Sequence, residues 1–140
     1  MKIKFKKLNK NAIIPSFSYE GDAGMDIYCD SDFTFEPGKI ISVSTGISME
    51  LPKSYVALIW DRSGLAFKNG IKTMGGVLDS GYRGEIKVIM INLSKDELAI
   101  KKGSRIAQML IQKYEVPEIE VVKELSDSER SSGGFGSSGI

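Results

Sequence analysis

Hydrophobic residues along this chain recur mostly at every second position, which is the pattern of strands with one buried face. The runs that predict strands cover residues 3–5, 25–29, 41–49, 55–60, 86–93 and 106–114. Turn sequences separate several of these runs, namely Glu36-Pro37-Gly38, Leu51-Pro52-Lys53 and Lys102-Gly103. Many short strands between such turns predict an all-β fold, a jelly-roll-like sandwich or barrel.

The helical signal is weak. One or two helical turns are expected at residues 63–68, with Ser63 as the N-cap and Asn69-Gly70 as the stop. The apolar run at residues 106–111 fits either a helix or a buried strand, and its shortness and its position after a turn favour a strand. We therefore expect at most one short helix.

The composition changes after residue 125. Residues 126–140 are rich in serine and glycine and contain only two hydrophobic residues, Phe135 and Ile140. Taken alone, such a segment is typical of a flexible tail or of a remnant of cloning. We divide the chain into a β domain at residues 1–125 and a flexible C-terminal arm at residues 126–140.

Length and charge narrow the class of protein. A chain of 140 residues with 41% hydrophobic and 26% charged residues fits one globular domain. No apolar run reaches the roughly 18 residues of a membrane span, and lysines interrupt the apolar residues near the start, which predicts a cytoplasmic protein. With 19 basic and 18 acidic residues, a broad basic face is absent, so we expect neither a nucleic-acid nor a membrane partner.

The chain has no histidine and a single cysteine, Cys29. Ser-His and Cys-His nucleophile pairs, His-ligated zinc and an intrachain disulfide are therefore excluded. Acid–base chemistry must come from Asp, Glu, Lys or Tyr, and a metal is expected to be a hard cation such as Mg²⁺.

Four loop segments join glycine to polar or charged side chains: residues 23–26, 61–64, 76–84 and 103–108. Each also has an ordinary explanation, as a turn, a capped helix, a hairpin or a strand after a turn. The second segment combines the Arg62 fork, a hydroxyl and a helix start, which suits a phosphate. We interpret the third as a β-hairpin whose backbone edge reads a planar base, with Asp79 at the strand end, pointing into the cleft, and Tyr82 beside the ligand. Spacing alone does not decide between the ordinary structural explanation of these segments and the ligand-binding one.

Taken together and in this order, five segments resemble the five motifs of the trimeric dUTP diphosphatases (dUTPases). The matching segments are Ala23-Gly24-Met25-Asp26, Arg62-Ser63-Gly64-Leu65-Ala66, and residues 76–84, 103–108 and 130–139. Each motif is of modest specificity, but five in the family's order at compatible spacing are a strong signal. The resemblance also turns the C-terminal tail into an arm that closes over an active site.

The resemblance implies a jelly-roll homotrimer with three active sites at subunit interfaces. It implies Mg²⁺-assisted hydrolysis of dUTP to dUMP and pyrophosphate, which limits uracil in DNA and supplies dUMP for thymidylate synthesis. Asp79 would hold the catalytic water and touch the 3′-hydroxyl, and Tyr82 would pack under the deoxyribose. Uracil would meet the backbone of Gly76, Val77 and Leu78 and the strand near Lys87. The other implied contacts are Arg62, Ser63, Gly64 and Gln108 on the phosphates, Asp26 near Mg²⁺ through water, and Arg130, Phe135, Gly136 and Ser137 over the base and γ-phosphate.

Three positions depart from the family pattern. Trp60-Asp61 precede Arg62 where proline is usual, Ser104 stands where Asp is common, and Thr73 stands where some members use Asn on uracil. One alternative is a dCTP deaminase, which would need a further glutamate to deprotonate a water at C4 of the base, and the 76–84 segment matches the uracil form better. Another alternative is a catalytically silent nucleotide-binding module. The presence of Asp79, Tyr82 and the arm argues against it.

Overall fold

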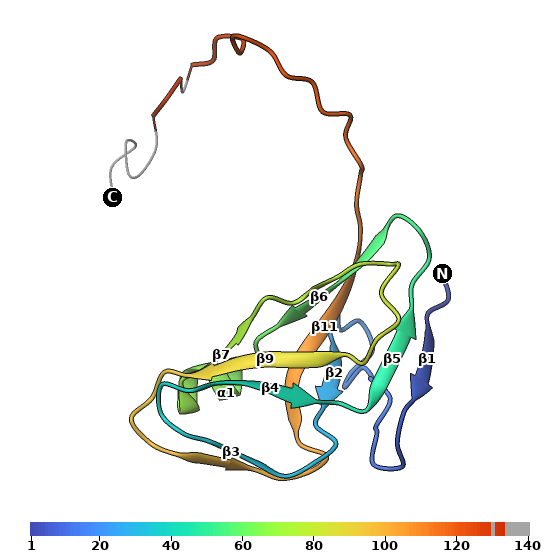
Figure 1. The fold of residues 1–140 in the computed structure, drawn as a ribbon, viewed down its shortest axis with the longest axis vertical. Helices are drawn as coiled ribbons and strands as arrows, with labels where there is room; N and C mark the ends of the chain where they lie inside the picture. Colours follow the sequence, from blue (N-terminus) through green and yellow to red (C-terminus); the bar gives the residue numbers. More distant parts are fainter. Residues whose placement is uncertain (130, 134–140) are drawn as a thin grey trace.

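Eleven short strands and one short helix make up the regular structure of residues 1–129 and 131–133, the part of the chain that the computed structural model describes (Figure 1). The strands are β1 Lys4–Lys7, β2 Met25–Tyr28, β3 Phe33–Phe35, β4 Ile40–Ser44, β5 Ile47–Glu50, β6 Tyr55–Trp60, β7 Ile71–Met74, β8 Val77–Leu78, β9 Lys87–Asn92, β10 Leu98–Ile100 and β11 Arg105–Lys113. The helix α1 spans Ser63–Asn69, between β6 and β7. The predicted all-β class with one short helix is confirmed.

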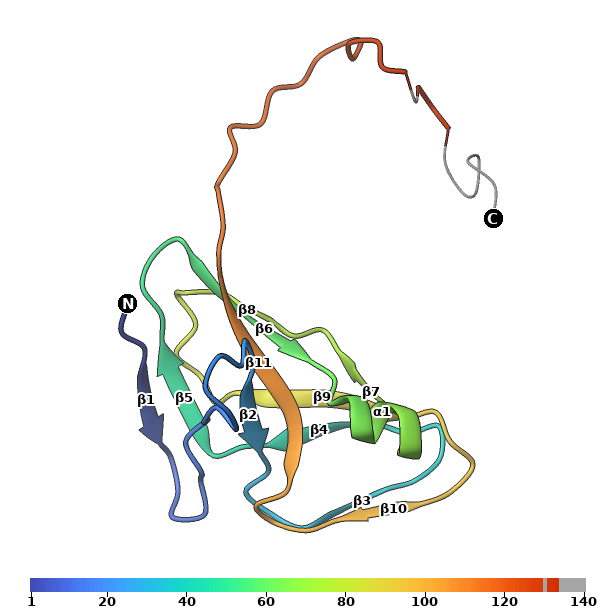
Figure 2. The ribbon, with the colours of Figure 1, turned by 180° about the vertical axis from the view of Figure 1, so that it is seen from behind.

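All strand pairs are antiparallel, and the strands form two larger and two smaller sheets. The larger sheets have the orders β2-β11-β6-β8 and β4-β9-β7, and the smaller ones are β1-β5 and β10-β3. The nine-residue β11 lies between β2 and β6, and Figure 2 shows it crossing the back of the domain. This strand thus links the N-terminal segment to the β6–α1 segment.

One hydrophobic core joins the sheets. In β9 the buried residues Val88 and Met90 alternate with the exposed Lys87 and Ile89, as the period of two predicts. The fully buried side chains include residues from both larger sheets and from the connections between them, among them Ile27, Ile86, Met90, Ile106 and Met109. The core therefore holds the sheets in a fixed relation, and the site is built on this rigid frame.

The alternating run at residues 41–49 is divided into two strands, contrary to its reading as one. Gly46 has a φ of 67°, and a Cβ there would lie 2.5 Å from Nδ2 of Asn9. The chain turns at this glycine, so that β4 pairs with β9 whereas β5 pairs with β1. Three strands of three or four residues, β3, β7 and β10, had no sequence prediction because their alternating patterns are too short.

The start of α1 also differs from the expectation. Arg62, not Ser63, is the N-cap residue, and its side chain makes no capping hydrogen bond. The C-terminal stop is confirmed: Gly70 is left-handed, with a φ of 65°, and its N–H donates to the carbonyl of Ala66. The helix thus has a well-formed end and a beginning without a local side-chain cap.

The segment at residues 76–84 is not a hydrogen-bonded hairpin. β8 pairs with β6, through Leu78 opposite Ala57, and not with β9. The reason is the close approach at Gly76, whose carbonyl accepts from the N–H of Ile59 at 2.8 Å. A Cβ at Gly76, where φ is 96°, would lie 2.8 Å from the carbonyl oxygen of Ile59.

After β11 the chain leaves the domain. Figures 1 and 2 show the segment after Lys113 arching away from the strands, and its apolar side chains are exposed. These exposed side chains are Val116, Ile119, Val121, Val122 and Leu125. The predicted arm residues Arg130, Phe135, Gly136 and Ser137 lie outside the described residues. No helix in the described part of the chain has the length and apolar character needed to span a bilayer.

Candidate functional site

Asp26, on β2, is a buried carboxylate held by two arginines. Its Oδ1 lies 3.1 Å from Nε of Arg62, and its Oδ2 lies 3.1 Å from a terminal nitrogen of Arg105. The hydroxyl of Ser18 donates to Oδ2 at 2.8 Å. Two positive charges thus flank one negative charge, and the cluster as a whole attracts anions.

A β-bulge in β11 places Arg105 and Gln108 on the same side of the strand. Residues three apart on a regular strand face opposite sides, but the pairing of β11 with β2 shifts register between Arg105 and Ala107. Ile106 and Ala107 are both fully buried as a result. The amide of Gln108 donates to the carbonyl of Asp61 at 2.8 Å, beside Arg62.

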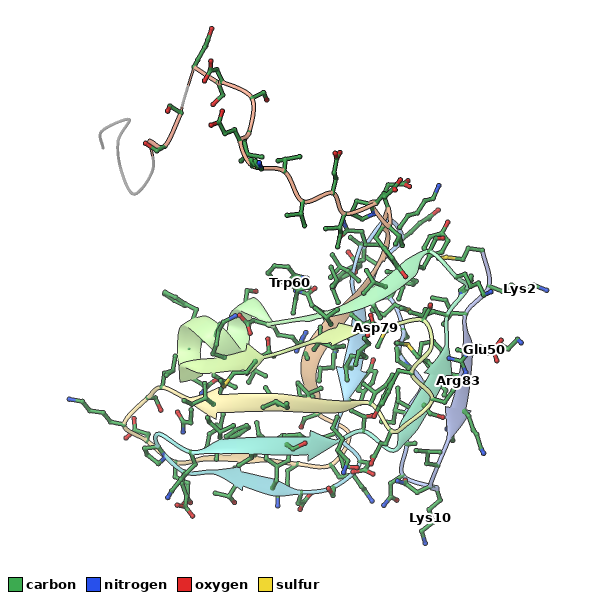
Figure 3. All side chains as sticks on the ribbon, turned by 45° about the horizontal axis from the view of Figure 1, so that its top comes forward. Lys2, Lys10, Glu50, Trp60, Asp79 and Arg83 are labelled. Carbon is green, nitrogen blue, oxygen red and sulfur yellow. The ribbon has the colours of Figure 1, made fainter. Side chains whose placement is uncertain are left out.

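These groups line a cavity of about 730 Å³. Its walls come from residues 18–26, the β6–α1 junction and β11, and include Asp26, Arg62, Ser63, Gly64, Arg105 and Gln108. Trp60 is half exposed in the same wall, and Figure 3 shows its side chain projecting outward from the body. We call this the arginine cavity. It brings together all of the predicted phosphate residues on the described part of the chain, together with Asp26.

Asp26 fits a metal ion only through a water shell. Both of its oxygens already bind arginines, and the described residues contain no cluster of three or more acidic or cysteine side chains that would hold a cation. A single, partly neutralised carboxylate suits Mg²⁺ that keeps several waters and is carried mainly by phosphate oxygens. The donor set therefore fits the predicted role of Asp26.

A second, smaller cavity of about 430 Å³ is lined by Ser42, Leu78, Tyr82, Glu85, Lys87 and Ile89. We call it the tyrosine cavity. It brings together three of the residues predicted to bind sugar and base, Leu78, Tyr82 and Lys87. β8 is the last strand of its sheet, so the outer edge of Val77 and Leu78 pairs with no other strand of the described chain. An unpaired strand edge offers N–H and C=O groups to a planar ligand.

The loop after β8 fixes Tyr82 from two sides. Its hydroxyl donates to the carbonyl of Glu85 at 2.8 Å, and its ring lies against Gly84, where a Cβ would come within 2.6 Å of Cζ. Arg83 closes the loop by donating to the carbonyls of Ser80 and Tyr82 at 2.6 and 2.9 Å. The orientation of the ring is therefore set by the loop itself before any ligand arrives.

Asp79 begins this loop, directly after β8, as the sequence predicted. Its backbone carbonyl accepts from the N–H of Tyr82 at 3.0 Å. Its side chain is exposed and makes no hydrogen bond or ion pair with the described residues. Contrary to the expectation that it points into a cleft, Asp79 lines neither cavity of the single chain. It is a carboxylate held by its backbone at the end of a sheet and left free to bind water or ligand.

Two of the three departures from the family pattern contact each other. Oδ1 of Asp61 accepts from both the N–H and the hydroxyl of Thr73, each at 2.6 Å, and Oδ2 accepts from Lys72 at 2.6 Å. Burial raises the pKa of Asp61, but the hydrogen bonds from Lys72 and Thr73 outweigh it, and the net pKa is lowered. Thr73 therefore faces Asp61. Ser104, the third departure, is placed by its backbone, which bonds to Lys101 and Cys29.

One chain thus carries two separate groups of predicted site residues, and sequence reasoning missed several neighbours. Arg105, Ser18 and Asp61 line the arginine cavity but were not predicted to contribute. Arg105 lies within a recognised motif, but regular strand alternation predicts that it faces away from Gln108. The bulge, which the sequence pattern does not reveal, brings both side chains to the same side. Ser18 carries no local signal, because its partner Asp26 lies eight residues away.

Comparison with known proteins gives one consistent answer. The dUTPase family model matches residues 10–139. Deoxyuridine 5′-triphosphate nucleotidohydrolase of Clostridioides difficile is 48% identical over 99% of this chain and 98% of its own, and that of Hydrogenobaculum sp. (strain Y04AAS1) is 47% identical over 100% and 99%. Among solved structures, a mutant dUTPase of Staphylococcus bacteriophage 80alpha with dUpNHpp has a TM-score of 0.95 and 30% identity, covering 99% of both chains. A mutant dUTPase from phage phi11 of S. aureus, described with a structural Mg(II) ion, has a TM-score of 0.83 and 23% identity over 89% of this chain and 98% of its own.

Proposed function

The chain belongs to the dUTPase family and hydrolyses dUTP to dUMP and pyrophosphate, and on this premise we propose that Asp79 positions the water that attacks the α-phosphorus. A new bond forms between the water oxygen and phosphorus, and the bond to the β-phosphate oxygen breaks in line with it. The single observation that carries the proposal is the exposed, unpaired Asp79 carboxylate at the rigid end of β8. With no histidine in the chain, a positioned carboxylate is the available base.

The tyrosine cavity and the edge of β8 select the nucleoside. Gly76, Val77 and Leu78 present backbone groups to uracil, with Lys87 on the neighbouring wall. Tyr82 packs under the deoxyribose and leaves no room for a 2′-hydroxyl. The proposal is supported by the fixed orientation of the Tyr82 ring, because a sugar can be rejected only by a group that does not yield.

The arginine cavity receives the phosphate chain. Nε of Arg62 is bound to Asp26, and its terminal nitrogens have no partner among the described residues, so they are available to phosphate oxygens. Ser63, Gly64 and Gln108 stand next to it in the same wall. Asp26 would hold Mg²⁺ through water, and the ion would neutralise the developing negative charge.

The protein works as a homotrimer whose active sites are shared between subunits. The support is that the phosphate and nucleoside residues of one chain line two different cavities, so that one chain alone does not assemble the predicted site. The exposed apolar side chains after β11 point the same way, since such a segment is more stable against another protein surface. We assign residues 126–140 to an arm in which Arg130, Phe135, Gly136 and Ser137 close over the ligand of a neighbouring subunit. We place the enzyme in the cytoplasm.

Replacing Asp79 by Asn tests the central assignment. The variant is expected to bind dUpNHpp as the unmodified protein does and to lose most of its turnover, because a positioned base contributes about 10²–10⁴-fold. Near-normal turnover would remove Asp79 from the role. Deletion of residues 126–140 should lower activity and leave a folded trimer, and full activity after the deletion would contradict the arm assignment.

Product analysis with dUTP, dCTP, dTTP and UTP separates the remaining readings. Pyrophosphate from dUTP alone supports the proposal, whereas ammonia from dCTP would indicate a deaminase and no product a silent binder. Glu85 is the glutamate in the tyrosine cavity, and a deaminase would need such a group free. Its carboxylate instead accepts hydrogen bonds from the Ser44 hydroxyl and from the N–H of Gly46.

A further inference from the structure

Asp61 binds two other segments of the chain at once. Its carboxylate accepts from Thr73 through the N–H and the hydroxyl, both at 2.6 Å, and from Lys72 at 2.6 Å. Its backbone carbonyl accepts the amide of Gln108 at 2.8 Å. Thr73 lies on β7, Gln108 lies on β11, and Asp61 itself lies between β6 and α1.

These contacts bridge the two larger sheets beneath the arginine cavity. β6 and β11 belong to the sheet β2-β11-β6-β8, whereas β7 belongs to β4-β9-β7. Asp61 ties the end of β6 to the other sheet at the point where the chain turns into α1. The position of the next residue, Arg62, is thereby fixed relative to both sheets.

The beginning of α1 has no local device that would hold it in place. Arg62 is the N-cap without a side-chain cap, and the first helical turn has no acidic residue. Ser63 and Gly64 are exposed, and a Cβ at Gly64 would meet nothing within 4 Å. Besides the ion pair of Arg62 with Asp26, the tether at Asp61 therefore holds the start of the segment that carries Arg62, Ser63 and Gly64.

We propose that Asp61 is a positioning residue for the triphosphate chain, which sets Arg62 through the backbone and Gln108 through its carbonyl. The inference rests on the proposed function, because it assigns Arg62 and Gln108 to phosphate. It adds that affinity for the β- and γ-phosphates depends on a carboxylate whose oxygens are engaged by Lys72 and Thr73 and which acts through the residues that it positions. The nucleoside half is unaffected, because none of the contacts of Asp61 reaches the tyrosine cavity.

The chain supplies a closely matched control. Asp32 accepts from the backbone N–H of Lys102 at 2.7 Å and from Lys101 at 3.1 Å, which is the same combination of a backbone donor and a lysine. It lies in neither cavity. Asp32→Ala removes a tether of the same kind, at a more exposed carboxylate for which no positioning role is proposed.

The experiment measures dissociation constants of dUMP and of dUpNHpp with Mg²⁺ for Asp61→Ala, Asp61→Asn and Asp32→Ala. In Asp61→Ala the affinity for dUpNHpp should fall by about tenfold or more while that for dUMP changes less than about twofold, because the charge-assisted hydrogen bonds from Arg62 to phosphate depend on where Arg62 is held. Asp61→Asn keeps an oxygen for Thr73 and should recover much of the loss. Asp32→Ala should leave the ratio of the two affinities unchanged.

Two outcomes overturn the proposal: unchanged dUpNHpp affinity in Asp61→Ala, or an equal loss for both ligands, which marks a merely structural role. Should Asp61→Ala fail to fold, Thr73→Val decides. It removes one of the two Thr73 hydrogen bonds and should shift the ratio in the same direction, and an unchanged ratio there also refutes the proposal. If the unmodified protein released no pyrophosphate from dUTP, the proposed function would fail instead, independently of these ratios.

Discussion

Gly84 should control the selectivity of the enzyme, although it makes no contact with substrate in the proposed site. A Cβ at this position would lie 2.6 Å from Cζ of Tyr82 and 2.9 Å from Cε2, whereas ordinary contact begins at 3.4 Å. Gly84→Ala must therefore displace the ring by about 0.8 Å at Cζ, the difference between the two distances. The hydrogen bond from Tyr82 to the carbonyl of Glu85, now 2.8 Å, would be lost or lengthened.

The cost should appear in catalysis more than in stability. One exposed hydrogen bond contributes about 0.5–1.5 kcal/mol, and the 43% exposed ring can swing into solvent without unfolding the loop. A catalytic geometry that is misplaced by about 1 Å loses up to 10²-fold, so we expect kcat/KM for dUTP to fall by about 10–100-fold. Because Tyr82 would no longer exclude the 2′-hydroxyl, the ratio of kcat/KM for dUTP over UTP should fall as well.

Gly81→Ala is the control in the same loop. Its Cβ would meet nothing within 4 Å, and its φ lies outside the left-handed region. Steady-state kinetics with dUTP and UTP on both variants, together with thermal unfolding, separate a displaced ring from a damaged loop. If Gly84→Ala matches Gly81→Ala in both kcat/KM and the dUTP/UTP ratio, the assignment of Tyr82 as a fixed sugar reader is refuted.

Three further predictions concern buried groups. Asn92→Ala should lower the free energy of unfolding by about 2–4 kcal/mol in urea titrations, because fully buried Asn92 donates to the carbonyls of Phe35 and Asp96. The control Asn11→Ala, at an exposed position, should change it by no more than about 0.5 kcal/mol, and equal effects of the two substitutions would contradict the prediction. Burial raises the pKa of the Cys29 thiol against opposing backbone hydrogen bonds, so a thiol reagent at neutral pH should react only as the chain unfolds, and immediate labelling of folded protein would disprove burial. The pKa of Asp61 is lowered by folding, so its stabilising effect is present above its unfolded pKa of about 3.9 and is lost as pH falls through the folded pKa. The free energies of unfolding of the unmodified protein and of Asp61→Asn should therefore converge in acid. A constant difference between them down to the folded pKa would contradict this prediction.

Apolar runs between turn sequences were enough for the strands that carry the core. β6 was predicted with its observed bounds, and β9 and β11 within one residue at each end: β9 from its alternation, β6 and β11 from short apolar runs, with β11 favoured as a strand because its run follows a turn. The same reasoning failed at Gly46 and Gly76, where the predicted strand pairing differs from the observed one. Their positive φ angles and close approaches redirect the chain between partners, which a local pattern does not encode.

For the site, sequence motifs identified the residues of the arginine cavity but not their connections. Motif order named Asp26, Arg62 and Gln108, which the fold brings into one cavity, whereas the hydrogen bond from Thr73 to Asp61 joins two positions that looked like independent departures. A contact between residues twelve apart on different elements is not encoded by a local pattern. The division between two cavities is likewise a property of the folded surface.

The bulge divides β11 into two parts whose side chains alternate in different registers. From Ala107 onward its alternation is set by the core, while Arg105 is displaced by one step so that it reaches Asp26. On a regular strand the three-residue spacing would set Arg105 on the opposite side from Gln108, so the extra residue at the bulge is what turns Arg105 into the cavity beside Gln108. Losing the bulge at unchanged chain length would turn Arg105 away, so the backbone irregularity at this point, and not only residue identity, is part of what the sequence must preserve for the proposed phosphate binding.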